Sequence, residues 1–396
     1  MNTISNVCLK NKRVLIRVDF NVPLDENLVI TDDSRMVSVL PTIKKVVSDG
    51  GMAIIMSHLG RPKNGFEEKL SLKHTTNHLS FLLNRPVSFG GDCIGERAVN
   101  DVVNMSSGDI LVLENLRFYR EEQNGDEEFA KKLARLGDVY VNDAFGTAHR
   151  SHASTAVIAK FFPKNKYFGL LMSKELGFLQ KTLNNKKKPF TAIIGGAKIA
   201  GKIDIIKSLF DKVDNLIIGG GMAYTFAKAM GGKVGNSLLE NEKVVLAKQL
   251  IKEAKKKGVN LLLPTDSVNA DSFSNDANTT ISSILSIEKT YMGLDLGGES
   301  IAVFSETIKK SKVIIWNGPM GVFEMSNFEN GTKKIGEAIC LATESGAFSL
   351  VGGGDSVAAI NKFGFGKRVS YVSTGGGAML DYLEGKKLPG VLAILD

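Results

Sequence analysis

A glycine-rich segment with an acid beside it follows an apolar run near the C-terminal end of the chain. The run is 348–351, and the segment 352–356 reads Gly-Gly-Gly-Asp-Ser. Glycines let backbone N–H groups approach a phosphate closely, a following helix N-terminus adds positive partial charge, and Asp355 is placed to hold Mg²⁺ between phosphoryl oxygens. The segment therefore predicts a bound nucleotide with its metal ion and, with them, phosphoryl transfer. The alternative is a tight turn in which Asp355 only caps a helix.

Further glycine turns follow other strand-like runs in the second half of the chain, at 195–196, 219–221 and 375–377. No complete G-x-G-x-x-G occurs among them, which disfavours a dinucleotide-binding domain. Residues 196–202 fit the spacing G-x-x-x-x-G-K, but Ile203 stands where a P-loop needs Ser or Thr to hold Mg²⁺.

Two lysines in this region have a spacing that suits catalysis. Lys198 and Lys202 are four residues apart, which predicts that they share one face of a helix near its N-terminus. Two ammonium groups there can neutralise a phosphoryl group during transfer. The alternative is an exposed face without function.

The first half of the chain instead presents charged and polar side chains after its strand-like runs. In open α/β sheets ligands bind beyond the carboxyl ends of the strands, so chemistry is expected at these positions. Guanidinium groups bind carboxylate and phosphate through paired hydrogen bonds, so several arginines at one sheet edge predict an anion site, whereas a single one is better explained as a surface ion pair. The candidates are Asp19, Asn21, Arg35, His58, Arg61, Arg117 and Arg150.

The remaining histidines receive structural interpretations. His74 and His78 have the spacing of metal ligands on a helix, but no acid completes an H-E-x-x-H pattern, so we interpret them as structural or exposed. His149 and His152 flank Arg150 and are expected to shape its loop.

Two further sets of residues are assigned no chemistry. The acidic stretch 121–128 is interpreted as an exposed loop and helix start. Cys8, Cys93 and Cys340 are isolated from one another in sequence, which predicts reduced thiols rather than disulfides or zinc ligands.

Length and composition bound the class of protein. With 396 residues, 43% hydrophobic residues and 41 glycines, the chain is long enough for two globular domains with many tight turns. No run of about 18 apolar residues or signal-peptide core occurs, so we expect no membrane insertion or secretion and a cytoplasmic location. The net charge of +8 is dispersed without a basic helix, which favours small phosphorylated anions over nucleic acid as partners.

Parallel sheets are needed to align these loops. Short β-branched runs alternate with segments of helical period in each half, which is typical of doubly wound α/β domains. The predicted strands are 14–20, 52–57, 109–113 and 139–142, then 190–194, 215–218, 260–263, 313–316, 348–351 and 370–372. The predicted helices include 34–48, 127–136 and one within 167–183 that joins the halves and is a candidate hinge.

The segment Arg-Val-Asp-Phe-Asn-Val-Pro at 17–23 closely resembles the signature of phosphoglycerate kinases. Further segments that resemble this family follow in its order over essentially the whole chain, and they lie at 57–62, 114–118, 142–150, 195–198, 316–324 and 373–378. The resemblance implies two doubly wound, Rossmann-like parallel-sheet domains joined by a hinge helix. The implied divisions are 1–166 for the phosphoglycerate-binding domain, 167–184 for the hinge helix, 185–383 for the nucleotide-binding domain, and 384–396 for a tail that returns to the first domain as a strand.

The resemblance implies reversible, Mg²⁺-dependent phosphoryl transfer between ATP and 3-phosphoglycerate, which yields ADP and 1,3-bisphosphoglycerate. Direct in-line attack with domain closure and no covalent enzyme intermediate is expected. Residues implied to bind phosphoglycerate are Asp19, Phe20, Asn21, Arg35, His58, Leu59, Gly60, Arg61, Arg117 and Arg150. Residues implied to bind the nucleotide are Lys198, Lys202, Asn317, Pro319, Val322, Glu324, Gly353, Gly354, Asp355 and Ser356, with Asp355 as the Mg²⁺ ligand. Groups implied to surround the phosphoryl group in transfer are Arg35, Lys198, Lys202, Gly354 and Gly376.

Three positions depart from the family pattern: Gly201 and Gly298 replace larger residues, and Ser356 replaces threonine but keeps the hydroxyl group. We expect Gly298 to soften the loop over the nucleotide base. Members of the family are usually monomeric, and no heptad pattern indicates otherwise. Two other classes stay open, a two-domain anion-binding protein and a divergent dehydrogenase. The lysines with Asp355 disfavour the first, and the incomplete glycine fingerprints disfavour the second.

Overall fold

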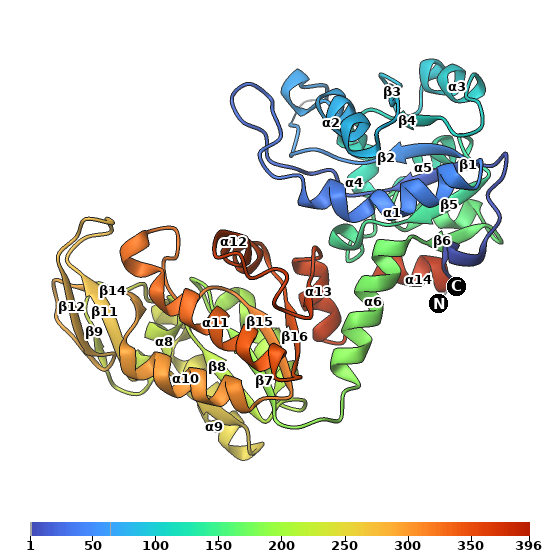
Figure 1. Ribbon diagram of the computed structural model, residues 1–396. Helices are drawn as coiled ribbons and strands as arrows, with labels where there is room; N and C mark the ends of the chain where they lie inside the picture. The colour runs from blue at the N-terminus through green and yellow to red at the C-terminus, as the bar shows by residue number, and fades with distance from the viewer. Residues whose placement is uncertain (1, 64) are drawn as a thin grey trace. The chain divides into compact units, whose positions relative to one another are not determined.

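The computed structural model describes residues 2–63 and 65–396 (Figure 1). The chain divides into two compact units, of which the first contains Met1–Gly177 with Lys387–Asp396 and the second contains Phe178–Lys386. The division falls inside helix α6 (Leu170–Leu183), which therefore supplies residues to both units. The hinge role of 167–184 stays a prediction. Within the described residues, no helix is both long and apolar enough to cross a bilayer.

The first unit is built on a six-stranded parallel sheet with the order β3-β4-β2-β1-β5-β6. Strands β1, β2 and β5 are buried along almost their whole length, as expected for a parallel sheet covered on both faces. The chain proceeds from β1 to β2 on one side and later adds β5 on the other, so a ligand is expected beyond the carboxyl ends of these strands. The bounds are β1 Arg13–Arg17, β2 Met52–Met56, β3 Ser88–Phe89, β4 Ile110–Val112, β5 Val139–Asn142 and β6 Lys166–Phe168.

Amphipathic helices pack against this sheet. Helix α1 places Met36, Val39, Ile43 and Val46, at helical spacing, in the core shared with the strands. Helix α5 begins after Asp126, whose carboxylate accepts the N–H of Phe129 at 2.7 Å and caps the helix. The bounds are α1 Ser34–Ser48, α2 Lys73–Leu83, α3 Glu96–Val103, α4 Arg120–Asn124, α5 Glu127–Ala134 and α14 Pro389–Leu395, with short 3-10 helices at Ile4–Asn6, Glu68–Leu70, Leu116–Phe118, Phe145–Thr147 and Val157–Phe161.

The second unit has a second six-stranded parallel sheet, with the order β10-β8-β7-β15-β16-β17. Its strands are β7 Phe190–Ile194, β8 Asn215–Ile218, β10 Asn260–Leu262, β15 Val313–Asn317, β16 Phe348–Val351 and β17 Tyr371–Val372. Two small sheets accompany it: the antiparallel β12-β11-β14 and the parallel pair β9 and β13. Their strands are β9 Lys233–Val234, β11 Asp266–Ala270, β12 Thr279–Ser283, β13 Ser286–Ile287 and β14 Met292–Leu296.

The core of the second unit is formed around Trp316 of β15, which is fully buried with Phe304, Ile335 and Ile339. The last three residues come from α10 and α11, which lie side by side (Figure 1). The helices are α7 Ile203–Leu209, α8 Met222–Ala229, α9 Val244–Lys256, α10 Gly298–Lys310, α11 Asn330–Glu344, α12 Gly354–Lys362 and α13 Gly377–Leu383, with 3-10 helices at Ala200–Lys202, Asn241–Lys243 and Ser326–Phe328.

The predicted fold class is confirmed, and differences occur at element ends. The predicted strand 14–20 stops at Arg17, because the N–H of Phe20 donates to the Oγ of Ser57 at 2.8 Å instead of to a neighbouring strand. The predicted helix within 167–183 begins at Leu170, since the residues before it form β6.

The C-terminal return strand was a wrong prediction, because the tail forms helix α14. Pro389 occupies the start of that helix, where its fixed φ is favourable and no N–H is required. The tail is tied to the first unit: the N–H of Gly390 donates to the carbonyl of Ala148 at 2.8 Å, and Asn142 Nδ2 donates to the Gly390 carbonyl at 3.2 Å.

Candidate functional site

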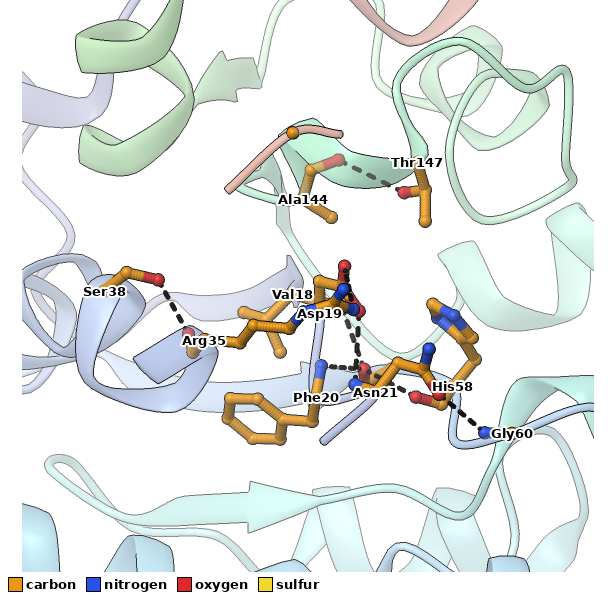
Figure 2. A network of polar contacts seen from close by, with 12 residues as sticks. Val18, Asp19, Phe20, Asn21, Arg35, Ser38, His58, Gly60, Ala144 and Thr147 are labelled. Carbon is orange, nitrogen blue, oxygen red and sulfur yellow. Dashed lines mark hydrogen bonds and ion pairs between the residues drawn. The ribbon is translucent and has the colours of Figure 1, made fainter. Parts of the chain in front are cut away.

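The loops that follow β1 and β2 are tied together in the first unit (Figure 2). The N–H of Asn21 donates to Asp19 Oδ1 at 3.1 Å, and Asn21 Oδ1 accepts the N–H of Gly60 at 2.8 Å. The N–H of Phe20 donates to Ser57 Oγ at 2.8 Å. The bonds from Gly60 to Asn21 and from Phe20 to Ser57 connect the loop after β1 with the loop after β2.

Asp19 and Arg35 form an ion pair at this edge of the sheet. The Nη1 of Arg35 lies 3.0 Å from Asp19 Oδ2 (Figure 2), and the Arg35 side chain is 40% exposed. Burial disfavours the charged form of Asp19, but its neighbours His58, Arg35 and Arg17, with the N–H of Asn21, together outweigh burial, and the pKa of Asp19 lies below its usual value. Because arginine carries five N–H donors, more than this pair uses, Arg35 is oriented yet able to bind an anion.

His58 is buried beside Arg17, a residue that sequence reasoning missed. The Nη2 of Arg17 lies 3.2 Å from His58 Nδ1, and since Arg17 can only donate, Nδ1 must accept. Burial and the neighbouring charges of Arg17 and Arg117 hold the pKa of His58 well below its usual value, although Asp19 acts in the opposite direction. The ring is therefore neutral at pH 7, with its proton on Nε2. The available signal for Arg17 was an arginine that ends an apolar strand two positions before Asp19.

Arg117 is held over the same loops. Its Nη1 donates to the Gly60 carbonyl at 2.8 Å, and its N–H donates to Asn115 Oδ1 at 3.0 Å. Asn115 Nδ2 in turn donates to the carbonyl of Leu59 at 2.7 Å. Burial, with the nearby charges of Arg17 and others, lowers the pKa of Arg117 to about 10, so the group stays charged at pH 7 while partly desolvated.

Two predicted arginines are placed differently from the rest. Arg150 is half-buried after β5, and its charge lowers the pKa of both Arg117 and His152, which indicates that it belongs to the cluster. Arg61 is exposed in the loop after β2. Hydrogen bonds or ion pairs directly connect five members of the predicted set, Asp19, Asn21, Arg35, Gly60 and Arg117. Phe20, His58 and Leu59 instead bond to Ser57, Arg17 and Asn115.

The residues given structural interpretations mostly behave as predicted. His78 Nε2 lies 2.8 Å from Asp33 Oδ2, and His74 Nε2 lies 2.7 Å from the carbonyl of Glu68. The three cysteines are free thiols, as predicted. The acidic residues of the stretch 121–128 are exposed except for Glu122, which is fully buried. The prediction was wrong for Glu122, because α4 directs its carboxylate to buried hydrogen-bond donors in the first unit.

The second unit contains a cavity of about 440 Å³ at the carboxyl ends of its central strands. Glycine loops form one part of the lining and apolar side chains another, which suits a ligand with a phosphate end and a flat apolar end. The predicted residues Pro319, Val322, Glu324 and Asp355 line it. Sequence reasoning missed other lining side chains, which include Tyr224, Leu238, Phe273, Met292 and Leu294. They carry no charge, and apart from Tyr224, which comes three residues after the glycine turn 219–221, they follow no glycine turn, so the sequence offered no signal for them.

Close backbone contacts build the wall of this cavity between β7 and β15, where the strand order reverses. The N–H of Gly195 donates to the carbonyl of Asn317 at 2.9 Å, and that of Gly196 to the carbonyl of Pro319 at 2.9 Å. A Cβ on Gly195 would lie 2.1 Å from the Pro319 carbonyl oxygen, so only glycine permits this approach.

Asn317 connects a lysine to the glycine-rich segment. Its Oδ1 accepts from Lys202 Nζ, and its Nδ2 donates to the carbonyl of Gly352 at 2.6 Å. Burial lowers the pKa of Lys202, while the nearby charge of Asp355 acts against that shift. The Oγ of Ser356 accepts the N–H of Gly318 at 2.6 Å, so this buried hydroxyl group fixes the loop after β15.

The prediction that Lys198 and Lys202 share a helical face is wrong. Lys198 is exposed in the loop after β7, Lys202 ends a 3-10 turn, and α7 begins only at Ile203. The loop is held out of helical conformation because Gly196 has φ +106° and the N–H of Ile199 donates to Glu240 Oε2 at 2.5 Å.

The start of α12 presents the predicted phosphate and metal groups. Gly353 has φ +99° and precedes the helix, while Gly354 and Asp355 are exposed in its first turn. Gly376, with φ +44°, precedes α13 in the same way. Mg²⁺ is usually held by one or two carboxylates together with substrate phosphates, and the carboxylate of Asp355 at the cavity fits that donor set.

An arginine-rich anion cluster on one parallel sheet and a glycine-lined cavity with a lysine and an acid on another define a two-unit phosphotransferase that uses a nucleotide. A sequence profile described as phosphoglycerate kinase matches residues 4–386, and the chain belongs to the phosphoglycerate kinase family. It is accordingly a phosphotransferase with a carboxyl group as acceptor, which transfers a phosphoryl group between ATP and 3-phosphoglycerate in glycolysis.

Individual phosphoglycerate kinases match this chain over nearly its whole length. The chain is 51% identical to the phosphoglycerate kinase of Porphyromonas gingivalis, with 99% of each chain covered, and 52% identical to that of Chloroherpeton thalassium, with 99% of this chain and 98% of the relative covered. Among solved structures, the phosphoglycerate kinase of Coxiella burnetii has a TM-score of 0.89 at 42% identity, covering 99% of this chain and 98% of its own. That of Pyrococcus horikoshii has a TM-score of 0.84 at 31% identity, covering 100% and 98%.

Proposed function

We propose that the cluster in the first unit binds 3-phosphoglycerate and the cavity in the second unit binds ATP as its Mg²⁺ complex. The observation that carries this proposal is the separation of two kinds of site: buried arginines and a buried histidine gather at the carboxyl ends of β1, β2 and β4, while the glycine-lined cavity lies after β7, β8 and β15. A small acid with two anionic groups suits the first site, and a nucleotide suits the second.

In the phosphoglycerate site, the arginines bind the anionic groups of the substrate. Arg35, Arg117 and Arg150 supply guanidinium donors. Arg61 supplies a fourth, and because its side chain is exposed, it can turn toward the ligand without disturbing packed neighbours. His58 donates from Nε2. Asp19 accepts a hydrogen bond from the substrate hydroxyl group, and the NH2 group of Asn21 donates one to it. Phe20, Leu59 and Gly60 contribute through the backbone that carries these side chains.

In the nucleotide site, the apolar lining that includes Val322 receives the base, and Pro319 borders it. Glu324, an exposed carboxylate on the cavity, accepts hydrogen bonds from the ribose hydroxyl groups. The phosphates lie at the N-terminus of α12, where the N–H groups of Gly353, Gly354, Asp355 and Ser356 and the helix dipole favour negative charge. Lys202 and Asn317 act on the phosphates together, since Asn317 orients the ammonium group.

Asp355 is the protein ligand proposed for Mg²⁺, which when bound neutralises charge on the phosphoryl oxygens. The side chain is free to reach the metal because it lies exposed in the first helical turn. Lys202 is close enough for its pKa to respond to Asp355, so the two groups can act on the same phosphate.

A carboxylate oxygen of 3-phosphoglycerate attacks the γ-phosphoryl group in line. Arg35, Lys198 and Lys202, with backbone N–H groups at Gly354 and Gly376, stabilise the equatorial oxygens. Because the reacting atoms must approach to about 3–3.5 Å and the substrates bind to different units, we propose that the units close on each other during turnover. Closure also excludes water as a competing acceptor.

We further propose that the protein acts as a monomer in the cytoplasm. The usual state of the family and the lack of a heptad pattern in the sequence support this proposal. Light scattering during size-exclusion chromatography should give a mass near 42.8 kDa, and twice that mass would contradict it.

The decisive experiment measures formation of 1,3-bisphosphoglycerate from ATP, 3-phosphoglycerate and Mg²⁺, coupled to its reduction. Turnover should be rapid in the wild type, should fall strongly in Lys202→Ala, and should persist in Lys207→Ala, an exposed lysine on α7 that serves as the matched control. Binding of Mg-ADP without any turnover would overturn the proposal and favour an anion-binding protein instead.

A further inference from the structure

Glu122 is a fully buried acid that the reaction does not use directly. It lies in α4, and both of its carboxylate oxygens accept from one residue: Oε1 from Ser154 Oγ at 2.6 Å and Oε2 from the Ser154 N–H at 2.9 Å. Removing a charged carboxylate from water is costly unless its partners compensate it. The two hydrogen bonds from Ser154 therefore fix the orientation of the Glu122 carboxylate.

The hydroxyl group of Ser154 links Glu122 to Arg17 through two hydrogen bonds. A serine hydroxyl has one proton, and here that proton points to Glu122. A lone pair is left for the Nε–H of Arg17, which lies 2.8 Å from Ser154 Oγ. Arg17 is also fully buried, and its Nη1 donates to the carbonyl of Val18.

The other end of the guanidinium group reaches His58, where Nη2 lies 3.2 Å from Nδ1. We propose that Glu122 is a positioning residue for the phosphoglycerate site: through Ser154 it orients Arg17 onto Nδ1 of His58, so that the ring presents Nε2–H to the anionic substrate. This assignment rests on the proposed binding of phosphoglycerate at the cluster.

The charges around His58 support the same arrangement. Burial and the charges of Arg17, Arg117 and Arg35 act to lower the pKa of His58, and Asp19 acts to raise it. A second histidine lies near the acid, since His152 Nδ1 is 3.9 Å from Glu122 Oε1. Burial and nearby arginine charges, Arg17 first, lower the pKa of His152 to about 4, so it is neutral at pH 7 and does not compensate Glu122.

A purely structural role is the competing explanation. The carbonyl of Glu122 accepts the N–H of Ala153 at 2.9 Å, so α4 also anchors the loop that carries Ser154. A structural anchor would affect stability without changing the tautomer of His58. The two explanations therefore differ in the tautomer that they predict for His58 when Glu122 is replaced, which NMR can measure.

The test is Glu122→Gln, with Glu121→Gln as the matched control on the exposed face of the same helix. Glutamine cannot accept from both groups of Ser154: its oxygen can accept the Ser154 N–H, but its NH2 then faces Ser154 Oγ, so the hydroxyl proton has to turn away from residue 122. The readout is long-range ¹H–¹⁵N NMR of the imidazole rings, with His58 assigned by a His58→Gln variant among the five histidines.

We expect the wild type and Glu121→Gln to show Nδ1 without a proton and Nε2 with one. In Glu122→Gln we expect a mixture of tautomers and protonation of His58 at higher pH than in the wild type. The KM for 3-phosphoglycerate should rise about tenfold, as expected for the loss of one charged hydrogen bond, while the KM for ATP changes by less than about twofold. If Glu122→Gln does not fold, Ser154→Ala removes only the hydroxyl link and should change His58 in the same way.

An unchanged His58 spectrum in a folded Glu122→Gln or Ser154→Ala protein overturns the inference, whatever happens to stability. The NMR readout does not depend on turnover. Failure of the proposed function would instead appear as a wild type that does not form 1,3-bisphosphoglycerate, so the two failures can be told apart.

Discussion

The two units form their binding sites by opposite means. The first gathers charged side chains inside the protein: Arg17 and Glu122 are fully buried, and Arg117 and His58 nearly so. The second relies on backbone, since loops around glycines such as Gly195 approach each other too closely for any side chain. Its cavity is lined mainly by apolar groups and by few charged ones.

The difference follows from the ligands that each site would bind. Burial lowers the pKa of Arg117 and of His58, and the charges of the neighbouring arginines lower both further, because buried positive charges repel one another. A small, doubly anionic acid relieves it and is therefore bound strongly and in one orientation. A nucleotide is larger and partly apolar, so shape and N–H donors at a helix start suit it better than many charges.

The largest effect should come from a cation of the first unit. Arg35→Ala should lower kcat about 100-fold, as is typical when one group that stabilises the transferring charge is removed. The KM for ATP should change by less than about twofold, since the proposed nucleotide site lies in the other unit. Steady-state kinetics measure both, with exposed Arg85→Ala as the control. Normal turnover in Arg35→Ala would remove this residue from the transfer step.

A second prediction concerns a feature that the two units share. Asp143 and Asp295 are buried, and each accepts a backbone N–H at a helix start, from Met172 and Gly331. Burial raises the pKa of each to about 7, above the value near 4 of an unfolded chain. The folded state therefore binds more protons than the unfolded state between pH 4 and 7. The stability from these groups is complete below about pH 4 and is lost as the pH rises through 7.

Asn variants of these two residues should remove that dependence. When the pH rises from 5 to 7, each acid should lower the unfolding free energy of the wild type by about 2–3 kcal/mol, which is about 1.4 kcal/mol per pH unit. Urea unfolding of Asp143→Asn and Asp295→Asn at both pH values measures the difference, with exposed Asp276→Asn as the control. A wild-type slope in both variants would mean that the two acids are ionised in the folded protein.

A third prediction tests the backbone character of the second unit. Gly318 has φ +95°, and a Cβ there would lie 2.2 Å from the Gly195 carbonyl oxygen. Gly318→Ala should therefore lower the unfolding free energy by about 1–3 kcal/mol and weaken ADP binding. Fluorescence of Trp316 reports the change directly, because it is the sole tryptophan and its Nε1 donates to the Gly318 carbonyl at 2.8 Å. Gly201→Ala is the matched control and should be nearly neutral, because its added Cβ would meet no described side chain or distant backbone atom within 4 Å.

The smallest effect should be a gain in stability. Gly298 is the first residue of α10, where proline is favoured, and Gly297 before it is extended, with φ −78° and ψ 173°, as a residue before proline requires. The carboxylate of Asp266 accepts the N–H groups of Glu299 and Ser300 and thus caps the helix without Gly298. Gly298→Pro should raise the unfolding free energy by about 0.4–1 kcal/mol. A decrease would indicate that the N–H of Gly298 is needed.

The sequence by itself determined the strands and the residues that follow them. Strands 139–142, 190–194, 215–218 and 348–351 were predicted with their observed bounds, because buried parallel strands are short, continuous apolar runs ended by glycine or polar residues. The same rule located His58, Arg117 and the segment that begins at Gly352, since ligands bind where such strands end.

Only the tertiary structure decided which polar residues are buried and what they contact. Glu122 belongs to an acidic stretch with the composition of a surface loop, and its burial depends on Ser154, 32 positions further along the chain. The separation of Lys198 from the helix that follows it depends on Glu240, which holds the loop from a distant segment. Hydrophobic periodicity records which face of an element is buried, whereas hydrogen bonds between distant segments leave no periodic signal, and so these partners could be known only from the folded chain.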